Sequence, residues 1–203
     1  MLLKFLALSS NLYLSFAFQS CEWLGASNGQ DVNCLPGWVA TGTCGSAANK
    51  DCIDPAPGSR NKYVTMLQCC ETKYTNSGGQ NSCTQTGSKK GTLLPCLSQD
   101  GSNNPLALYG ICGSGRSKDC RIQSDSGKYT FTETCCENAD ITVIDGGACG
   151  WRHGNYGDNI VCPAGYVASG YCGSGSSQEC EAGSSSKAAV GIYCCPFEDN
   201  KRP

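Results

Sequence analysis

The chain carries two versions of one stretch, Cys34-Leu-Pro-Gly-Trp-Val-Ala-Thr-Gly-Thr-Cys44-Gly-Ser and Cys162-Pro-Ala-Gly-Tyr-Val-Ala-Ser-Gly-Tyr-Cys172-Gly-Ser. A third version, Leu106-Ala-Leu-Tyr-Gly-Ile-Cys112-Gly-Ser, follows an insertion from Ser98 to Asn104. Glycine recurs two residues before and directly after the last cysteine of each version, which indicates bulges, turns or close backbone approach. Because valine, threonine and aromatic residues favour extended structure, Gly37 to Cys44 and Gly165 to Cys172 are predicted strands.

The cysteines place these stretches in a longer repeat. The chain of 203 residues has 18 cysteines, which fall into three sets of six that each end in an adjacent pair. In every set, twelve residues separate the first two cysteines and seven separate the third from the fourth. The sets are Cys21, Cys34, Cys44, Cys52, Cys69 and Cys70; Cys83, Cys96, Cys112, Cys120, Cys135 and Cys136; and Cys149, Cys162, Cys172, Cys180, Cys194 and Cys195. Three concordant copies indicate an internal repeat, which we expect at 18–82, 83–148 and 149–203.

The first residues have the layout of a secretory signal peptide. Lys4 supplies a positive charge, Phe5 to Phe16 is mostly apolar, and Ser15 and Ala17 offer small residues for cleavage. We expect cleavage after Ala17, which removes 1–17 and yields a secreted, extracellular protein. A membrane anchor is the alternative, but the apolar stretch is short and polar residues interrupt it. No later stretch predicts a membrane span.

Disulfides are the expected state of all 18 cysteines, because an even count in an oxidising compartment leaves no thiol over. Zinc binding is the alternative, but zinc sites favour closely spaced cysteine knuckles that the chain lacks. Six cysteines allow 15 connectivities, so the pairing within each repeat is open. We expect the third and fourth cysteines to close their short loop, which leaves the first two to reach the adjacent pair.

The remaining pattern predicts an all-β protein. Tyr63 to Cys70, Lys128 to Cys136 and Ile141 to Ile144 are rich in β-branched and aromatic residues and are predicted strands. Lys128-Tyr-Thr-Phe-Thr-Glu-Thr alternates apolar and polar residues, as a half-buried strand does. No part of the mature chain has a long helical period. We therefore expect a disulfide-rich β fold that the three repeats share, with independent beads as the alternative.

Three motifs of the third repeat, echoed in the first, carry a resemblance to a known family. They are Cys149-Gly-Trp-Arg-His-Gly-Asn-Tyr-Gly, Val161-Cys-Pro-Ala-Gly-Tyr-Val and the closing Val190-Gly-Ile-Tyr-Cys-Cys. The first repeat echoes them with Trp23, Leu35-Pro-Gly-Trp-Val and Met66-Leu-Gln-Cys-Cys. In these motifs the chain resembles the vitelline membrane outer layer protein 1 family.

The resemblance implies a secreted threefold β-prism, with one antiparallel sheet for each repeat. It also implies a structural role in egg coats or other secretions, with carbohydrate contacts. The chain departs from the family in its many more cysteines and in lacking the acidic Asp-Asp-Thr-Ala stretch before the last strand. The middle repeat also lacks the Cys-Pro-x-Gly opening.

Residues that could support catalysis are few. His153 is the single histidine and has no nucleophile motif near it, so we expect a surface or structural role. An acid precedes every fourth cysteine, at Asp51, Asp119 and Glu179; in a threefold fold these acids would lie too far apart for a glycosidase pair. We expect them to accept backbone hydrogen bonds in the Cys-Gly-Ser turn. Without a P-loop, a dinucleotide motif or a calcium loop, no enzyme activity, cofactor or metal is predicted.

Aromatic residues are the better candidates for ligand contacts. Trp23, Trp38, Trp151 and Tyr166 occupy matching positions in the first and third repeats, where they either pack in the core or stack on sugar rings. A net charge of −2 without a basic run argues against nucleic acid as a partner. We expect a structural or binding protein of an extracellular matrix, egg coat or secretion, with a glycan or glycoprotein partner. A secreted defence or venom-like module and a sugar-acting enzyme are the alternatives.

Overall fold

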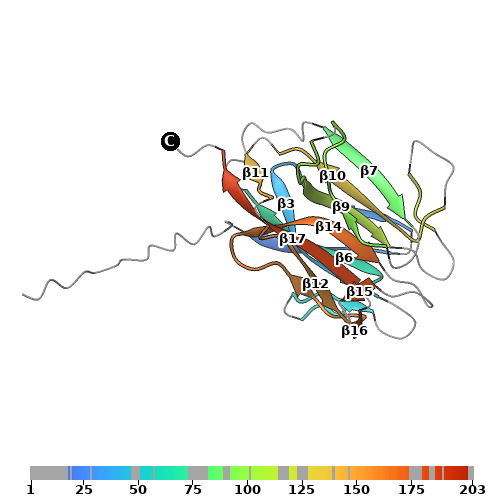
Figure 1. The fold of residues 1–203 in the computed structure, drawn as a ribbon. Coiled ribbons are helices and arrows are strands. Elements are labelled where there is room, and N and C mark those ends of the chain that lie inside the picture. The colour runs from blue at the N-terminus through green and yellow to red at the C-terminus, as the bar shows by residue number, and fades with distance from the viewer. Residues whose placement is uncertain are drawn as a thin grey trace, which may run out of the picture.

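Every regular element that the structure describes is a β-strand (Figure 1). The computed structural model describes residues 18, 20–27, 29–46, 51–56, 58–72, 82–88, 92–100, 102–113, 119–122, 128–138, 140–145, 147–173, 180–182, 186–188 and 190–200. The predicted signal peptide, 1–17, lies outside these residues. Among them there is no helix of the length and hydrophobicity that a membrane crossing needs.

Three antiparallel sheets build the molecule. The first has the order β1 (Cys21–Ala26), β6 (Thr65–Glu71), β3 (Trp38–Gly45) and β13 (Ile160–Val161). The second has the order β7 (Cys83–Ser88), β10 (Phe131–Cys136), β9 (Ala107–Gly113) and β2 (Asp31–Asn33). In the third, β17 (Val190–Asp199) pairs with β12 (Gly150–Gly154), β11 (Ile141–Val143) and β14 (Tyr166–Gly173), and β14 pairs with β8 (Leu94–Pro95). Two ribbons pair β4 (Cys52–Ile53) with β5 (Lys62–Tyr63) and β15 (Cys180–Ala182) with β16 (Ser186–Ala188).

Each sheet contains one short strand from a different six-cysteine segment. We call these segments 1, 2 and 3, running from Cys21 to Cys70, from Cys83 to Cys136 and from Cys149 to Cys195. Strand β2 of segment 1 joins the second sheet, β8 of segment 2 joins the third, and β13 of segment 3 joins the first. The second cysteine of each segment anchors the exchange through its amide: Cys34 donates to the Tyr109 carbonyl at 2.7 Å, Cys96 to Ser169 at 2.7 Å and Cys162 to Thr41 at 2.8 Å. The exchange is cyclic and links the three segments by backbone hydrogen bonds.

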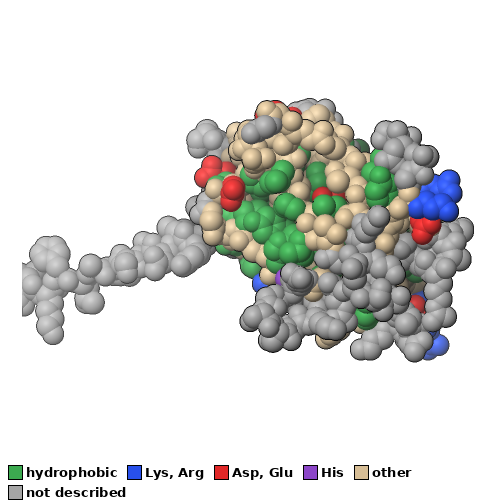
Figure 2. All heavy atoms as spheres, turned by 45° about the vertical axis from the view of Figure 1, so that its right-hand side comes forward, with side chains coloured by type: hydrophobic (Ala, Val, Ile, Leu, Met, Phe, Trp, Pro, Cys, Tyr) green, Lys and Arg blue, Asp and Glu red, His purple; other side chains and the backbone are tan. Residues whose placement is uncertain are grey.

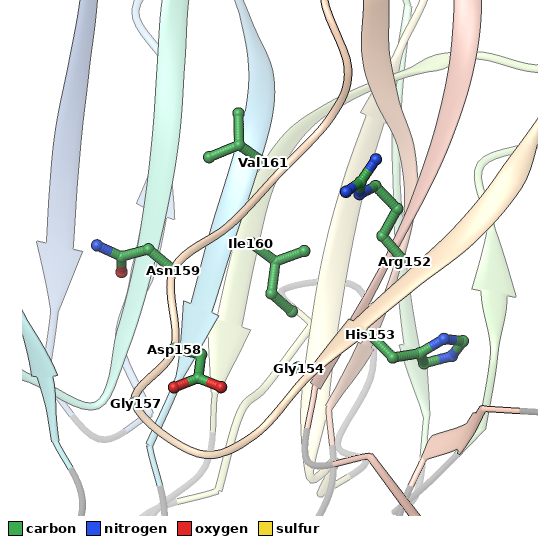
Figure 3. Close-up of a pocket in the computed structure, with 8 residues that line it drawn as sticks. All are labelled: Arg152, His153, Gly154, Gly157, Asp158, Asn159, Ile160 and Val161. Carbon is green, nitrogen blue, oxygen red and sulfur yellow. The ribbon is translucent and has the colours of Figure 1, made fainter. Parts of the chain in front are cut away.

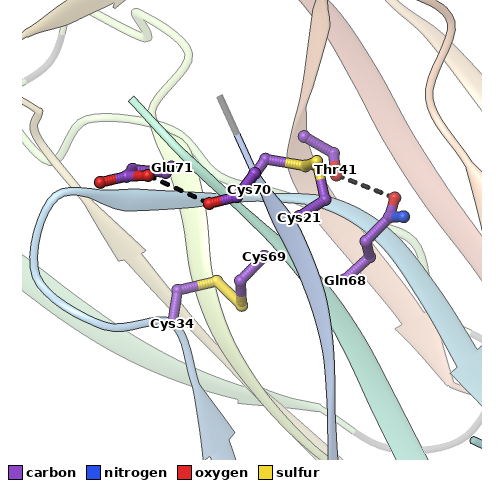
Figure 4. The surroundings of a disulfide bond; sticks show 8 residues. Cys21, Cys34, Thr41, Gln68, Cys69, Cys70 and Glu71 are labelled. Atoms are coloured by element: carbon purple, nitrogen blue, oxygen red, sulfur yellow. Dashed lines mark hydrogen bonds between the residues drawn. A yellow bond between two sulfur atoms is a disulfide. The ribbon is translucent and has the colours of Figure 1, made fainter. Parts of the chain in front are cut away.

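Nine disulfides use all the cysteines, and each segment has the same pairing. The bridges are Cys21–Cys70, Cys34–Cys69 and Cys44–Cys52; Cys83–Cys136, Cys96–Cys135 and Cys112–Cys120; and Cys149–Cys195, Cys162–Cys194 and Cys172–Cys180. Figure 4 shows why the adjacent pair is useful: Cys69 and Cys70 point to opposite faces of β6, so that Cys70 reaches Cys21 on β1 and Cys69 reaches Cys34 directly after β2. The expected closure of the third-to-fourth loop is confirmed.

The all-β class and the antiparallel pairing are confirmed, and the predicted strands appear as β3, β6, β10, β11 and β14. One detail of the prediction is wrong. Strand β10 is not half-buried, because Thr132 is 1% exposed and Glu133 is 2% exposed. Thr132 and Glu133 are adjacent in β10 and point to opposite faces, so both faces of the strand are covered at this point.

The core is shared by the three sheets. The middle strands β3, β9 and β14 contact one another, and one cluster of buried side chains includes residues of all three sheets. At the position two residues before each adjacent cysteine pair stand Leu67, Glu133 and Ile192, none of them more than 2% exposed. Strand pairing alone does not set the angles between sheets, so the threefold prism stays a prediction.

Candidate functional site

The outward faces of the three sheets carry equivalent cross-strand pairs. One member stands two residues after the first cysteine of a segment, and the other stands directly before the adjacent cysteine pair. The pairs are Trp23 with Gln68, Gln85 with Thr134, and Trp151 with Tyr193. Side chains opposite each other on antiparallel strands are in reach of one another, so each pair is a local unit of the surface. The third face differs from the other two because both of its members are aromatic.

The rings of Trp151 and Tyr193 pack against each other on the third face. Their centroids are 5.1 Å apart with the planes tilted by 37°. The His153 ring lies on the other side of Trp151, with centroids 6.1 Å apart and planes within 28° of parallel. All three side chains are half-buried. Figure 2 shows hydrophobic side chains gathered on one face of the molecule.

His153 occupies a position that holds glycine in the other segments. A Cβ at Gly25 would lie 2.3 Å from the Tyr63 ring, and a Cβ at Gly87 would lie 2.4 Å from the Tyr129 ring. A tyrosine ring therefore covers the edge strand in segments 1 and 2. In segment 3 the residue that corresponds to these tyrosines, by its pairing with the fourth cysteine, is Ala188.

In segment 3, therefore, the aromatic ring at this point of the edge strand belongs to the strand itself: it is the ring of His153. Burial lowers the pKa of His153 below its ordinary value, and its Nε2 is buried without a hydrogen-bond partner. A histidine ring with a lowered pKa favours its neutral form at neutral pH. The surface or structural role expected for this histidine stays a prediction.

A pocket of about 550 Å³ lies beside His153 (Figure 3). Its lining residues are Arg152, His153, Gly154, Gly157, Asp158, Asn159, Ile160 and Val161, all from β12, β13 and the loop between them. In Figure 3 the His153 ring points away from Asp158, so the two do not form an acid–base pair. The Asp158 carboxylate instead accepts a hydrogen bond from the Asn155 amide at 3.0 Å. The lining contains no serine, cysteine or lysine that could act as a nucleophile.

The structure does not bring the four predicted aromatic residues together. Trp23 packs on the Cys44–Cys52 bridge and Met66, whereas Trp38 and Tyr166 pack against the main core. Trp151 packs on the Cys172–Cys180 bridge. All four side chains are half-buried, so core packing accounts for one side of each ring and leaves part of the other accessible. Of the four, Trp151 alone has a described aromatic partner on the outward face.

Tyr193 was missed in the sequence because it reads as part of a strand that ends in the adjacent cysteines. A comparison of the three segments would have singled it out, because Gln68 and Thr134 stand where the third segment has Tyr193. An aromatic residue at a position where the other two segments have polar residues indicates that the surface of the third segment differs from theirs.

The structure describes two of the three acids that precede a fourth cysteine. Asp51 pairs with Lys62 across the β4–β5 ribbon, with 3.4 Å between Nζ and the carboxylate, and Asp119 is exposed. Glu179 lies outside the described residues. The structure instead buries Glu133 beside Cys96 and Cys135, a cluster with the atom types of a metal site. Those two cysteines are bonded to each other, so they offer no thiolate to a metal.

No family model, curated protein or solved structure matches the chain. The resemblance to the vitelline membrane outer layer protein 1 family therefore stays a hypothesis that rests on the short motifs.

Proposed function

We propose that this chain is a secreted structural or binding protein of an extracellular matrix, egg coat or secretion, that it acts without catalysis, and that it binds carbohydrate. The observation that carries the proposal is the set of nine disulfides, which leaves no free thiol. Such bridges persist in oxidising compartments and are reduced in the cytosol. The redox chemistry of the chain therefore fits an extracellular site of action.

The scaffold has the properties that a structural role outside the cell requires. Each bridge restricts the unfolded chain and typically contributes about 2–4 kcal/mol to stability. The cyclic exchange of β2, β8 and β13 adds hydrogen bonds between segments that are distant in the sequence. Cross-links and hydrogen bonds of this kind raise the free energy of the local opening that proteolysis of a folded protein requires, which is an advantage in secretions.

The first residue after the expected cleavage site supports secretion as well. The Phe18 ring stacks on Phe197, with centroids 5.5 Å apart and planes within 23° of parallel. Cleavage after Ala17 would leave Phe18 as a docked N-terminal residue. The mature chain would thus begin at the point where it joins the folded core.

Carbohydrate is the ligand class that the outward surfaces fit best. Tryptophan and tyrosine rings combine an apolar face with a polar rim, and sugars have apolar C–H faces ringed by hydroxyls. The catalytic groups that a sugar-acting enzyme needs, two carboxylates set across a sugar, do not lie together in the pocket beside His153. These two observations support binding without turnover.

The test is to measure binding and turnover on the same purified, oxidised protein. We expect weak, saturable binding to immobilised glycans and no release of reducing sugar from them. Release of sugar by the pure protein would reject the non-enzymatic proposal, and failure to bind any glycan in a broad panel would reject the carbohydrate ligand.

A further inference from the structure

We propose that the third sheet carries the glycan site on its outward face, where the rings of Trp151 and Tyr193 stack against the sugar rings of a neutral, linear polysaccharide. We call the surface formed by Trp151, Tyr193 and His153 the aromatic face. The proposal rests on the proposed function and gives it a location, a ligand class and residues that can be changed.

The protein itself shows that aromatic residues are not required at these positions for folding. The second sheet has Gln85 and Thr134 in the places of Trp151 and Tyr193, with the same strand pairing and the same cross-strand disulfide. The first sheet has one ring of the two, Trp23, opposite Gln68. Since three equivalent scaffolds accept three different pairs, the paired rings of the third sheet need an explanation other than the fold.

The rings of the aromatic face are held close to the strands. Gly191 lies beneath them, because a Cβ at this residue would be 3.1 Å from His153 and 3.4 Å from Trp151. The other segments have Met66 and Thr132 at this position. On the neighbouring strand, a Cβ at Gly170 would be 3.1 Å from the Tyr193 Cβ. Gly191 thus leaves room for the His153 and Trp151 rings close to the strand, and Gly170 leaves room for the Cβ of Tyr193.

The support below the rings is rigid. Trp151 packs on the buried Cys172–Cys180 bridge together with Leu93, and Tyr193 packs against the main core. Rings fixed in this way lose little conformational entropy when a ligand binds, which favours binding by a small surface. A half-buried pair of this kind is preorganised for stacking.

The chemistry of the face selects a neutral ligand. Tryptophan and tyrosine carry no charge at neutral pH, and the partly buried His153 ring favours its neutral form. No described side chain of the aromatic face offers an ion pair to a sulfated or uronic-acid chain. Pyranose rings whose substituents are all equatorial present flat C–H faces, so a β-1,4-linked glucan matches two adjacent rings better than a chain with axial substituents does.

The experiment uses the full mature chain and cellohexaose as the probe, with maltohexaose as the comparison sugar. The variant W151Q/Y193T gives the third sheet the pair that the second sheet has, so its fold should be kept. Its matched control is W23Q, which removes a tryptophan from the equivalent position of the first sheet. We expect W151Q/Y193T to bind cellohexaose at least about tenfold more weakly than the wild type, and W23Q to bind as the wild type does.

A second measurement needs no variant that might misfold. The three tryptophans give three indole N–H signals in an NMR spectrum, and we expect cellohexaose to shift the Trp151 signal and leave the other two in place. Wild-type binding with an unchanged affinity in W151Q/Y193T would overturn the site and leave the proposed function standing. The absence of any saccharide binding by the wild type would overturn both. If the Trp151 signal shifts with lipid vesicles or proline-rich peptides and not with cellohexaose, the aromatic face binds another class of ligand and the glycan proposal is wrong.

Discussion

The backbone amide of Tyr171 donates a hydrogen bond to the Glu133 carboxyl group across 3.0 Å, inside the core that the three sheets share. Glu133 is 2% exposed, and its equivalents in the other segments are Leu67 and Ile192. Burial raises the pKa of Glu133 well above its ordinary value, and the hydrogen bond from Tyr171 opposes this shift only in part. The protein thus holds a carboxylic acid, favoured in its neutral form, at a position that the other segments fill with aliphatic residues.

Glu133 should make stability depend on pH. Because its pKa is higher in the folded than in the unfolded protein, the folded state binds the proton more tightly. The contribution is therefore complete below the unfolded pKa of about 4.3 and is lost as the pH rises towards the folded value. We expect the free energy of unfolding to fall by up to about 1.4 kcal/mol per pH unit in that interval.

Denaturant unfolding with intact disulfides, measured at a series of pH values on the wild type and on E133Q, checks this prediction. The slope should be absent from E133Q, which keeps the size of the side chain and has no titrating group. E133L should also lose the slope, but it leaves the buried Tyr171 amide without its acceptor, so we expect it to be about 1–3 kcal/mol less stable than E133Q. Parallel pH profiles for the wild type and E133Q would contradict the account.

The Tyr63 ring over Gly25 predicts a selective effect of a single methyl group. In G25A the new Cβ would meet the Tyr63 ring at 2.3 Å, so the ring must move off its packing against the Cys44–Cys52 bridge. We expect a loss of about 1–3 kcal/mol in the free energy of unfolding. The control is G150A, also on an edge strand, where no heavy atom lies within 4 Å of the added Cβ. G150A should change stability by less than about 0.5 kcal/mol, and equal losses in the two variants would refute the packing of Tyr63.

The contribution of each disulfide to the free energy of unfolding should depend on the length of the loop that it closes. Cys34–Cys69 spans 35 residues and Cys44–Cys52 spans 8 residues. Constraint of the unfolded chain grows with loop length, which gives about 4 kcal/mol for the first bridge and about 2.5 kcal/mol for the second. Chemical denaturation of C34A/C69A and C44A/C52A compares them. If C44A/C52A is less stable than C34A/C69A, the packing around the Cys44–Cys52 bridge in the folded protein contributes more than the difference in loop entropy.

Phe18 predicts where the mature protein begins. N-terminal sequencing of the protein from a secreting host should start at Phe18, the residue that stacks on Phe197. A double-mutant cycle with F18A and F197A should give a coupling energy of about 0.5–1.5 kcal/mol between the rings. A mature chain that starts after Phe18, or a coupling of zero, would remove this residue from the folded core.

Most of the correct predictions came from the cysteine spacing. A disulfide requires two cysteines to lie close together, and a short loop between them already limits their distance. Seven residues between Cys44 and Cys52 allow these two to meet, and the adjacent Cys69 and Cys70 must point to opposite faces of a strand. Strand composition located β3 and β14, whose valine, threonine and tyrosine residues are typical of β structure.

The strand exchange and the aromatic face lay beyond the sequence for a physical reason. Strands β2, β8 and β13 are two or three residues long, which is too short to show an alternating pattern, and their partners lie in another segment. Burial of Glu133 also contradicts the pattern of its strand, because polar residues at inward positions look like solvent-facing ones. A comparison of the three segments singles out Tyr193, but its cross-strand pairing with Trp151 is visible only in the structure.

The strand exchange predicts that one segment alone does not fold. A fragment from 149 to 203 keeps the bridges Cys149–Cys195, Cys162–Cys194 and Cys172–Cys180 but loses β8, which pairs with Gly170 and Tyr171. Its own β13 loses the partner strand β3, and the Cys162 amide loses the Thr41 carbonyl. With open edges and a third of the shared core, the oxidised fragment should give a poorly dispersed NMR spectrum and associate through its edges. The mature chain from 18 to 203 is the control, and a dispersed spectrum from the monomeric fragment would show that the segments fold independently.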